Sequence, residues 1–166
     1  MITVTKYEVF DGVPKFKNSF LVNLFIQMEE EKISDVVFRD IEKMDFKQWL
    51  WLFRSGYSRL YVVFDEGHPV ALGWLTKMEH KSCHIHFCVF EKGRGTHSVE
   101  YGKELCKKIF YDFSCITAYV PIDNEKILHY SEKVGFKKVG MIPGFYFVAE
   151  QKKMIDCHVI YLPKED

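Results

Sequence analysis

The chain has 166 residues, of which 48% are hydrophobic and 16% aromatic. A chain of this size buries roughly 70% of the surface it exposes when unfolded, so we predict one folded domain over residues 1–166 that needs no disulfide or metal. Its 23 basic and 23 acidic residues give zero formal charge. Nucleic-acid binding relies on an excess of Lys and Arg, so we expect no nucleic-acid partner.

The N-terminal segment predicts neither a leader nor a membrane anchor. Residues 1–8 lack a basic stretch followed by an apolar one, and no apolar run approaches the ~18 residues that cross a bilayer. The five cysteines have no Cys-x-x-Cys spacing and lie in segments with a core pattern, which favours reduced thiols. We therefore expect a cytoplasmic protein without a membrane partner.

The first half of the chain predicts two helices followed by three strands. Apolar residues recur at helical spacing over 19–32, and Asp45 with Gln48 resembles a capping box that opens a helix ending near Gly56. Alternating patterns then predict the following strands: a hairpin over 60–64 and 70–76, and a third strand over 83–90 with Cys83, Ile85, Phe87 and Val89 on one apolar face.

The second half of the chain alternates helices and strands. We predict a helix over 97–113, a strand over 115–120, a helix from a cap at Asp123 through Lys133, and strands near 137–142 and 155–162. This order is typical of an α/β or α+β domain with a parallel crossover around the helix over 97–113.

A loop with two glycines between the strand over 83–90 and the next helix is the first candidate for a binding site. Gly93 and Gly95 allow a tight turn whose amides can face an anion at the positive end of the helix. Arg94 adds a cation for a charge-assisted contact. The loop therefore indicates a phosphate or pyrophosphate site, and a plain tight turn is the alternative.

The most specific segment is Asn124-Glu-Lys-Ile-Leu-His-Tyr-Ser-Glu-Lys-Val-Gly-Phe136, with Gly140 four residues later. Together with the preceding strand, loop and helix, it resembles the GNAT superfamily of acetyl-CoA-dependent N-acetyltransferases. It is most similar to the branch that acetylates ribosomal-protein N-termini and to small GNAT proteins of phages. The resemblance implies a mixed, largely antiparallel sheet of about six or seven strands, flanked by about four helices, whose parallel fourth and fifth strands splay apart.

The resemblance also implies how acetyl-CoA would bind. The pantetheine arm would lie between the strands over 83–90 and 115–120, paired with backbone groups of Cys88, Val89 and Phe90, with Asn124 nearby. The family's pyrophosphate motif is degenerate here, since Gly93, Thr96 and Ser98 occupy its three positions. The amides expected to hold the pyrophosphate are those of Arg94, Gly95, Thr96, His97 and Ser98.

The resemblance further implies candidates for the transfer chemistry. Many family members carry a Tyr, five residues before the Phe of the Gly-Phe pair, that protonates the leaving CoA thiolate. That position is Ser131 here, and Tyr130 precedes it. Imidazole has the right intrinsic pKa for a general base, which makes His84 and His86 candidates, and His86 is favoured because it lies nearer the expected thioester carbonyl. The alternatives are that these side chains only pack, and that water relays the proton; no metal site is expected.

Two hypotheses on function follow. The first is an N-acetyltransferase in which a primary amine, on a protein N-terminus or a small molecule, attacks acetyl-CoA directly. The second is a non-catalytic GNAT-like binding or assembly domain, of phage or prophage origin, with a protein partner or as a homodimer. An open and electropositive cleft at 93–98 would favour the first, and a cleft plugged by side chains such as Phe90, His97 and Phe145 the second. Trp51, Tyr57 and Phe145 to Phe147 are further candidates for an acceptor pocket.

Overall fold

The computed structural model describes residues 1–165. Within them, seven strands form one mixed sheet in the order β1-β4-β5-β6-β7-β9-β8, and β2 and β3 form a separate hairpin. The strands are β1 (Thr3–Lys6), β2 (Val9–Phe10), β3 (Val13–Pro14), β4 (Arg59–Asp65), β5 (His68–Glu79), β6 (Ser82–Val89), β7 (Cys115–Pro121), β8 (Lys137–Val148) and β9 (Lys153–Pro163). The helices are α1 (Asn18–Glu30), α2 (Ser34–Val37), α3 (Phe46–Arg54), α4 (Ser98–Ile109) and α5 (Glu125–Val134), with a 3₁₀ turn η1 (Glu91–Gly93).

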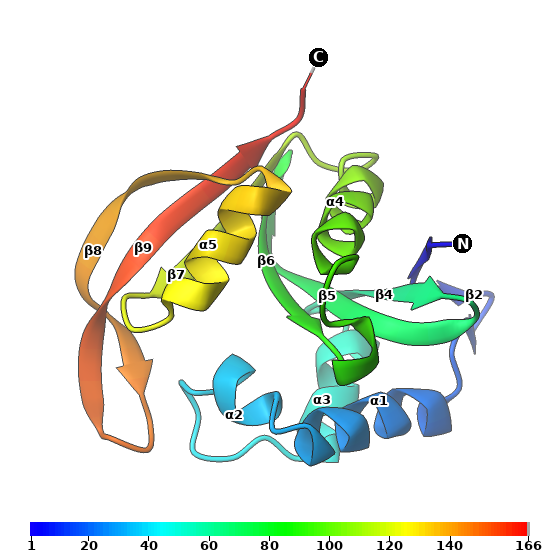
Figure 1. The fold of residues 1–166 in the computed structure, drawn as a ribbon. Coiled ribbons are helices and arrows are strands. Elements are labelled where there is room, and N and C mark those ends of the chain that lie inside the picture. The colour runs from blue at the N-terminus through cyan, green and yellow to red at the C-terminus, as the bar shows by residue number, and fades with distance from the viewer. Residues whose placement is uncertain (166) are drawn as a thin grey trace.

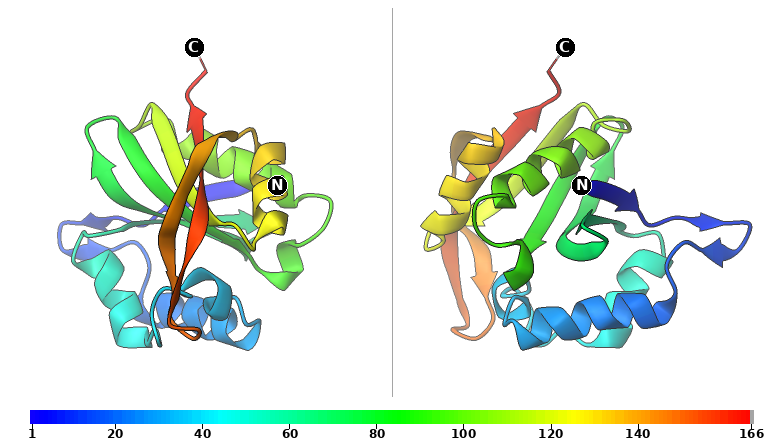
Figure 2. Two further views of the ribbon diagram at one scale, coloured as in Figure 1. Left: turned by 90° about the vertical axis from the view of Figure 1, so that its left-hand side faces the viewer. Right: turned by 45° about the vertical axis from the view of Figure 1, so that its right-hand side comes forward.

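Two layers of helices cover the sheet, as Figures 1 and 2 show: α4 and α5 on one face, and α1 to α3 on the other. Side chains alternate along the central strands, so that Tyr61 and Leu75 pack under α4 whereas Leu60 and Trp74 pack under α1 and α3. The predicted capping box is confirmed, because Asp45 accepts from the first-turn amides of α3 while Gln48 bonds back to Asp45. The sheet therefore has one hydrophobic core on each of its faces.

The sheet divides between β6 and β7. These two strands are parallel and pair over three residues only, from Ser82 opposite Cys115 to His84 opposite Thr117. Beyond that point β6 continues along β5 and β7 continues along β9, without pairing to each other. The predicted splay of two parallel strands is thereby confirmed, and so is the mixed, mostly antiparallel sheet.

Several elements differ from the sequence-based prediction. Strand β1, the β2–β3 hairpin and the short helix α2 were not predicted, and β8 extends to Val148 because a bulge carries it past Pro143 and Gly144. The cap of α5 is Asn124, which accepts from the amide of Ile127. The predicted cap, Asp123, instead forms two hydrogen bonds of 2.9 Å with Arg39.

The five cysteines are free thiols, and four of them are buried. No helix within residues 1–165 combines the length and the apolar character needed to cross a bilayer.

Candidate active site

The gap between β6 and β7 contains a cavity of about 880 Å³, a size typical of small-molecule sites. Its lining includes His86 and Cys88, whose side chains lie on one face of β6, and Phe87 and Val89 from the opposite face. Helices α2, α4 and α5 and strands β7 and β8 close the remaining sides. The cavity thus passes through the sheet at the point where the strands separate.

Backbone groups of β6 reach this gap at alternate residues. The amide of Phe90 donates to the carbonyl of Val70 at 2.9 Å, and Cys88 lies opposite Leu72 in the same register. Because the direction of hydrogen bonding alternates along an antiparallel pair, Cys88 and Phe90 bond to β5, whereas the backbone groups of Phe87 and Val89 point toward β7. The structure therefore corrects the prediction of Cys88, Val89 and Phe90 as the pantetheine contacts. The backbone groups of Val89 and Phe87 are the ones that face the gap without a partner in β5.

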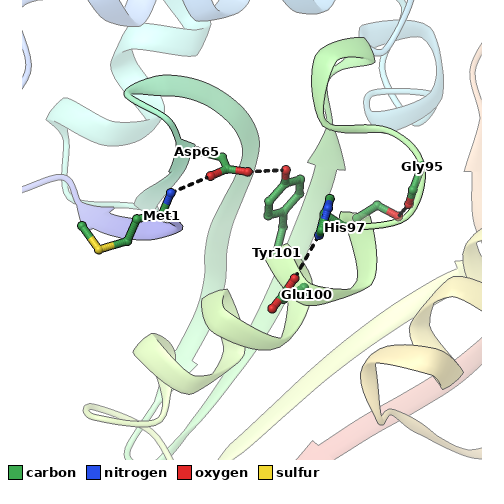
Figure 3. A network of polar contacts seen from close by, with 7 residues as sticks. Met1, Asp65, Gly95, His97, Glu100 and Tyr101 are labelled. Atoms are coloured by element: carbon green, nitrogen blue, oxygen red, sulfur yellow. Dashed lines mark hydrogen bonds and ion pairs between the residues drawn. The ribbon is translucent and has the colours of Figure 1, made fainter.

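Helix α4 begins at the edge of the cavity without a side-chain cap. His97 occupies the N-cap position, but its ring contacts Glu100 at 3.2 Å instead of capping the helix (Figure 3). The amides of Arg94 and Ser98 are bonded within the loop, to carbonyls of the preceding residues. Within residues 1–165, five amides of this turn have no hydrogen-bond partner: those of Gly95, Thr96, His97, Val99 and Glu100. A helix start of this kind is suited to binding an anion.

The start of α4 is anchored to the end of β4. The hydroxyl of Tyr101 donates to Asp65 at 2.9 Å, and the other oxygen of Asp65 accepts from the ammonium of Met1 at 3.2 Å (Figure 3). The hydrogen bond from Tyr101 holds the pKa of Asp65 below its usual value. These bonds fix the first turn of α4, and with it the free amides.

Arg94 lines the cavity but is already paired with Glu31. Its Nη2 lies 3.3 Å from Oε2 of Glu31, which also accepts from the amide of Glu91, while Gln27 donates to the second oxygen at 2.9 Å. The side chain of Glu31 is only 13% exposed. Glu31 thus ties the loop to the end of α1, and a phosphate group at Arg94 would compete with it.

Tyr130 lines the cavity from α5, and its hydroxyl is held by a backbone carbonyl. It donates to Ser98 at 2.6 Å, and its ring stacks on Phe87 at 5.7 Å between centroids. Gly102 makes room for it, since a Cβ at Gly102 would lie 2.6 Å from the Tyr130 hydroxyl. Burial raises the pKa of Tyr130, so the group is a neutral hydroxyl at physiological pH.

Ser131 and Asn124 also line the cavity from α5. The hydroxyl of Ser131 donates to the carbonyl of Ile127 at 2.8 Å, one turn back in the same helix. The side-chain oxygen of Asn124 accepts from the Ile127 amide at 3.3 Å. The amide N–H groups of the Asn124 side chain have no partner within residues 1–165, and they remain free to donate to a ligand.

His84 and His86 face the cavity from β6, with ring centroids 5.1 Å apart. Nε2 of His86 lies 3.1 Å from the hydroxyl of Thr76, and its ring stacks on Trp74 at 5.4 Å. Burial lowers the pKa of His84 to about 3 and that of His86 to about 4, and the charge of Lys77 adds to both shifts. Both rings are therefore neutral acceptors but weak bases. Within residues 1–165, no group of three His, Cys, Asp or Glu side chains is placed to hold a metal.

The cleft is open. Phe90, one of the three side chains that would plug it, is fully buried in the core beside α1, and His97 is 67% exposed outside the cavity. Phe145 lines the cavity without filling it, as does Tyr57, whereas Trp51 packs on Tyr57 outside it. These three side chains therefore do not plug the cavity beside Arg94, which meets one of the two conditions for the transferase hypothesis, whereas the charge of Arg94 is paired with Glu31.

Lys77 and Tyr119 are among the lining residues that the sequence analysis missed. Nζ of Lys77 lies 5.0 Å from the ring centroid of Tyr119 and 6.0 Å from that of Phe145. Regular alternation along β5 would place Lys77 on the opposite face from Thr76, so the strand pattern did not predict that Lys77 lines the cavity.

A mixed sheet with two splayed parallel strands, and an uncapped helix start beside the gap, defines the GNAT fold. The structure is similar to that of a spermidine N-acetyltransferase from Vibrio cholerae in complex with CoA and spermine, with a TM-score of 0.75 and 16% sequence identity, covering 98% of this chain and 95% of that chain. It is also similar to mutant forms of the spermidine/spermine N-acetyltransferase from the same organism (TM-score 0.70, 17% identity, 98% and 95% covered) and to a dodecameric structure of that enzyme (0.69, 14%, 98% and 93%).

No protein-family model and no curated protein sequence matches the chain. The sequence identities to these structures are only 14–17%, so the structural similarity establishes the fold alone. The finer resemblance to the ribosomal-protein branch and to phage proteins stays a prediction.

Proposed function

We propose that the protein transfers the acetyl group of acetyl-CoA to a primary amine. The observation that carries this proposal is the cavity through the splayed strands, which presents free backbone groups of Phe87 and Val89 at one side and an uncapped helix start at its edge. Pantetheine contains two amide groups, which suit an unpaired strand edge, and its pyrophosphate suits free helix amides. CoA bound in a structurally similar enzyme supports the same assignment.

Direct transfer forms one C–N bond and breaks the C–S bond of the thioester. The amine loses a proton, and the CoA sulfur leaves as a thiolate that gains one. His86 and His84 are neutral and accept a hydrogen bond from the amine, which orients it. Because each ring is a weak base, a water molecule carries the proton away from the site.

Ser131 is the better placed of the two hydroxyls to protonate the thiolate. The carbonyl that it bonds, that of Ile127, lies within α5 and is also the helix partner of the Ser131 amide, so the hydroxyl can rotate away at little cost. Tyr130 would have to break a bond of 2.6 Å that joins two helices. We therefore assign the proton transfer to Ser131 and a positioning role to Tyr130.

The experiment that tests the proposed function is an acetyl-transfer assay. The purified protein is incubated with acetyl-CoA and a panel of primary amines that includes a short peptide with a free N-terminus, and each product is identified by mass spectrometry. Acetylation of at least one amine, lost in Ser131→Ala, supports the proposal. If CoA binds but no amine or peptide is acetylated, the non-catalytic binding domain is the better description.

The finer expectations are proposals too. The five free cysteines favour a reducing compartment, which agrees with a cytoplasmic enzyme that uses acetyl-CoA. The structurally similar spermidine acetyltransferase forms a dodecamer. For this chain a homodimer or a protein partner is a proposal that light scattering at micromolar concentration tests.

A further inference from the structure

The cavity carries a lysine that no acidic side chain neutralises. Its charged lining residues are Glu31, Lys32, Asp40, Lys77 and Arg94, and of these Arg94 pairs with Glu31 beside the loop. Lys77 lies at the other end, near the histidines, and forms no salt bridge within residues 1–165. Its ammonium group rests over the rings of Tyr119 and Phe145. Such an unpaired cation can form an ion pair with an anionic ligand.

A bulge in β5 puts Lys77 in this position. Thr76 pairs with His84, but the next pairing along the strand is Glu79 with Ser82, so the register shifts between them. Lys77 has a φ of +44°, in the left-handed region that lysine rarely adopts. In a regular strand Thr76 and Lys77 would point to opposite faces, whereas here the ammonium group of Lys77 lies over the ring of Tyr119, which His84 contacts from the face that carries His86 and Thr76. The strained conformation is what brings the ammonium group to the site, as is typical of functional positions.

The surroundings of Lys77 determine what it would attract. Its ammonium group lies over the uncharged rings of Tyr119 and Phe145, and its charge helps to lower the pKa values of His84 and His86. The acidic side chains among the described lining residues are those of Glu31 and Asp40, and neither forms an ion pair with Lys77. A ligand with a second ammonium group would be repelled there, and a ligand with a carboxylate would be attracted.

We propose that Lys77 selects acceptor amines that also carry a carboxylate, and that it disfavours polyamines. This inference rests on the proposed function and names its substrate class. It separates this protein from the structurally similar enzyme that binds spermine. Lys77 is a specificity-determining residue, and it exchanges no proton or bond in the reaction.

The test compares pairs of amines that differ only in a carboxylate: lysine with 1,5-diaminopentane, and phenylalanine with 2-phenylethylamine. For each pair, the ratio of kcat/KM values is measured in the wild-type protein and in Lys77→Met. The two amines of a pair differ in basicity, but this difference is the same in both proteins and cancels. We expect Lys77→Met to lower the preference for the carboxylate by about fivefold, the effect of one partly exposed ion pair, and Lys77→Glu to reverse it. Lys77→Arg keeps it.

Lys152→Met is the matched control, because Lys152 is also left-handed, with a φ of +49°, but lies in the turn between β8 and β9 and does not line the cavity. In Lys152→Met the ratio of kcat/KM values for each pair of amines should equal the ratio in the wild-type protein. An unchanged ratio in Lys77→Met, measured on a protein with a wild-type unfolding temperature, overturns the inference while leaving the transferase function intact. Absence of transfer to all four amines overturns the inference even where CoA binds. Absence of CoA binding overturns the proposed function as well.

Discussion

The hydroxyl of Tyr130 donates to the carbonyl of Ser98 at 2.6 Å and thereby ties α5 to the first turn of α4. This bond links the helix that carries Ser131 and Asn124 to the helix start whose amides are free. The two parts of the site, the anion end and the transfer end, are therefore held at a fixed separation.

This arrangement predicts different effects for two neighbouring substitutions. Tyr130→Phe keeps the stacking on Phe87 but removes the bond to Ser98, so the free energy of unfolding should fall by about 1 kcal/mol. Ser131→Ala should leave stability nearly unchanged and lower kcat by about 100-fold, the usual effect of losing a general acid. Denaturant unfolding and steady-state kinetics on both variants check this. A large loss of kcat in Tyr130→Phe with none in Ser131→Ala would exchange the two roles.

Gly102 is predicted to be intolerant of a larger side chain. Alanine is the better helix former by up to about 1 kcal/mol, but its Cβ would lie 2.6 Å from the Tyr130 hydroxyl and 2.7 Å from Cγ2 of Val134. Crowding of this kind costs about 1–3 kcal/mol, so Gly102→Ala should be destabilising overall. The additional change Tyr130→Ala should make Gly102→Ala less costly, because it removes one of the two clashes. Equal costs in both backgrounds would show that Tyr130 is not the obstacle.

The alternation along β6 predicts opposite results for proline at two adjacent positions. The amide of Val89 points into the gap, so Val89→Pro removes no bond to β5 and should weaken CoA binding about tenfold with little change in unfolding temperature. Cys88→Pro breaks the pairing with Leu72 and should cost about 3 kcal/mol or more. Calorimetric titration with CoA and thermal unfolding measure the two effects. Equal destabilisation by both prolines would contradict the register.

The two cavity histidines predict how stability depends on pH. Their pKa values in the folded protein, about 3 for His84 and about 4 for His86, lie below the 6.5 of the unfolded chain. Between pH 6.5 and about 4 the unfolded chain therefore binds more protons, and stability falls as the pH falls, by about 1 kcal/mol per pH unit for each histidine. Above pH 7 they contribute no pH dependence.

Unfolding free energies measured from pH 7 to 4.5 check this dependence, and the double variant His84→Asn, His86→Asn should flatten it. Hydrogen bonds from Tyr101 and Arg39 hold the pKa values of Asp65 and Asp123 below the ordinary 3.8, so these carboxyl groups add a loss of stability only as the pH approaches 3.8, and the wild type and the double variant share that loss. An equally steep curve for the double variant would assign the dependence to other groups.

Local patterns in the sequence predicted much of the fold. The Asp45 and Gln48 capping box and the apolar face of the strand over 83–90 are encoded by neighbours a few residues apart, and both are confirmed. The splay of β6 and β7 followed from the resemblance around Asn124 to Gly140, and it is confirmed too.

The rest depends on contacts between distant segments. The bulge at Lys77 arises from how β5 pairs with β6, and the pairing of Arg94 with Glu31 joins residues 63 positions apart. The register between β6 and β5 determines which backbone groups of β6 face the gap. The sequence alone therefore could not show that the backbone groups of Phe87, and not those of Cys88, face it. Such features are set by tertiary pairing and leave no periodic signal.

The central claim is that the gap between β6 and β7 binds acetyl-CoA. It is tested most directly by following the unfolding temperature of the purified protein during titration with acetyl-CoA and, separately, with CoA. We predict a saturable rise with both ligands, equivalent to about 2.7 kcal/mol at 100 times the dissociation constant. An unfolding temperature unchanged by either ligand at millimolar concentration would contradict the claim.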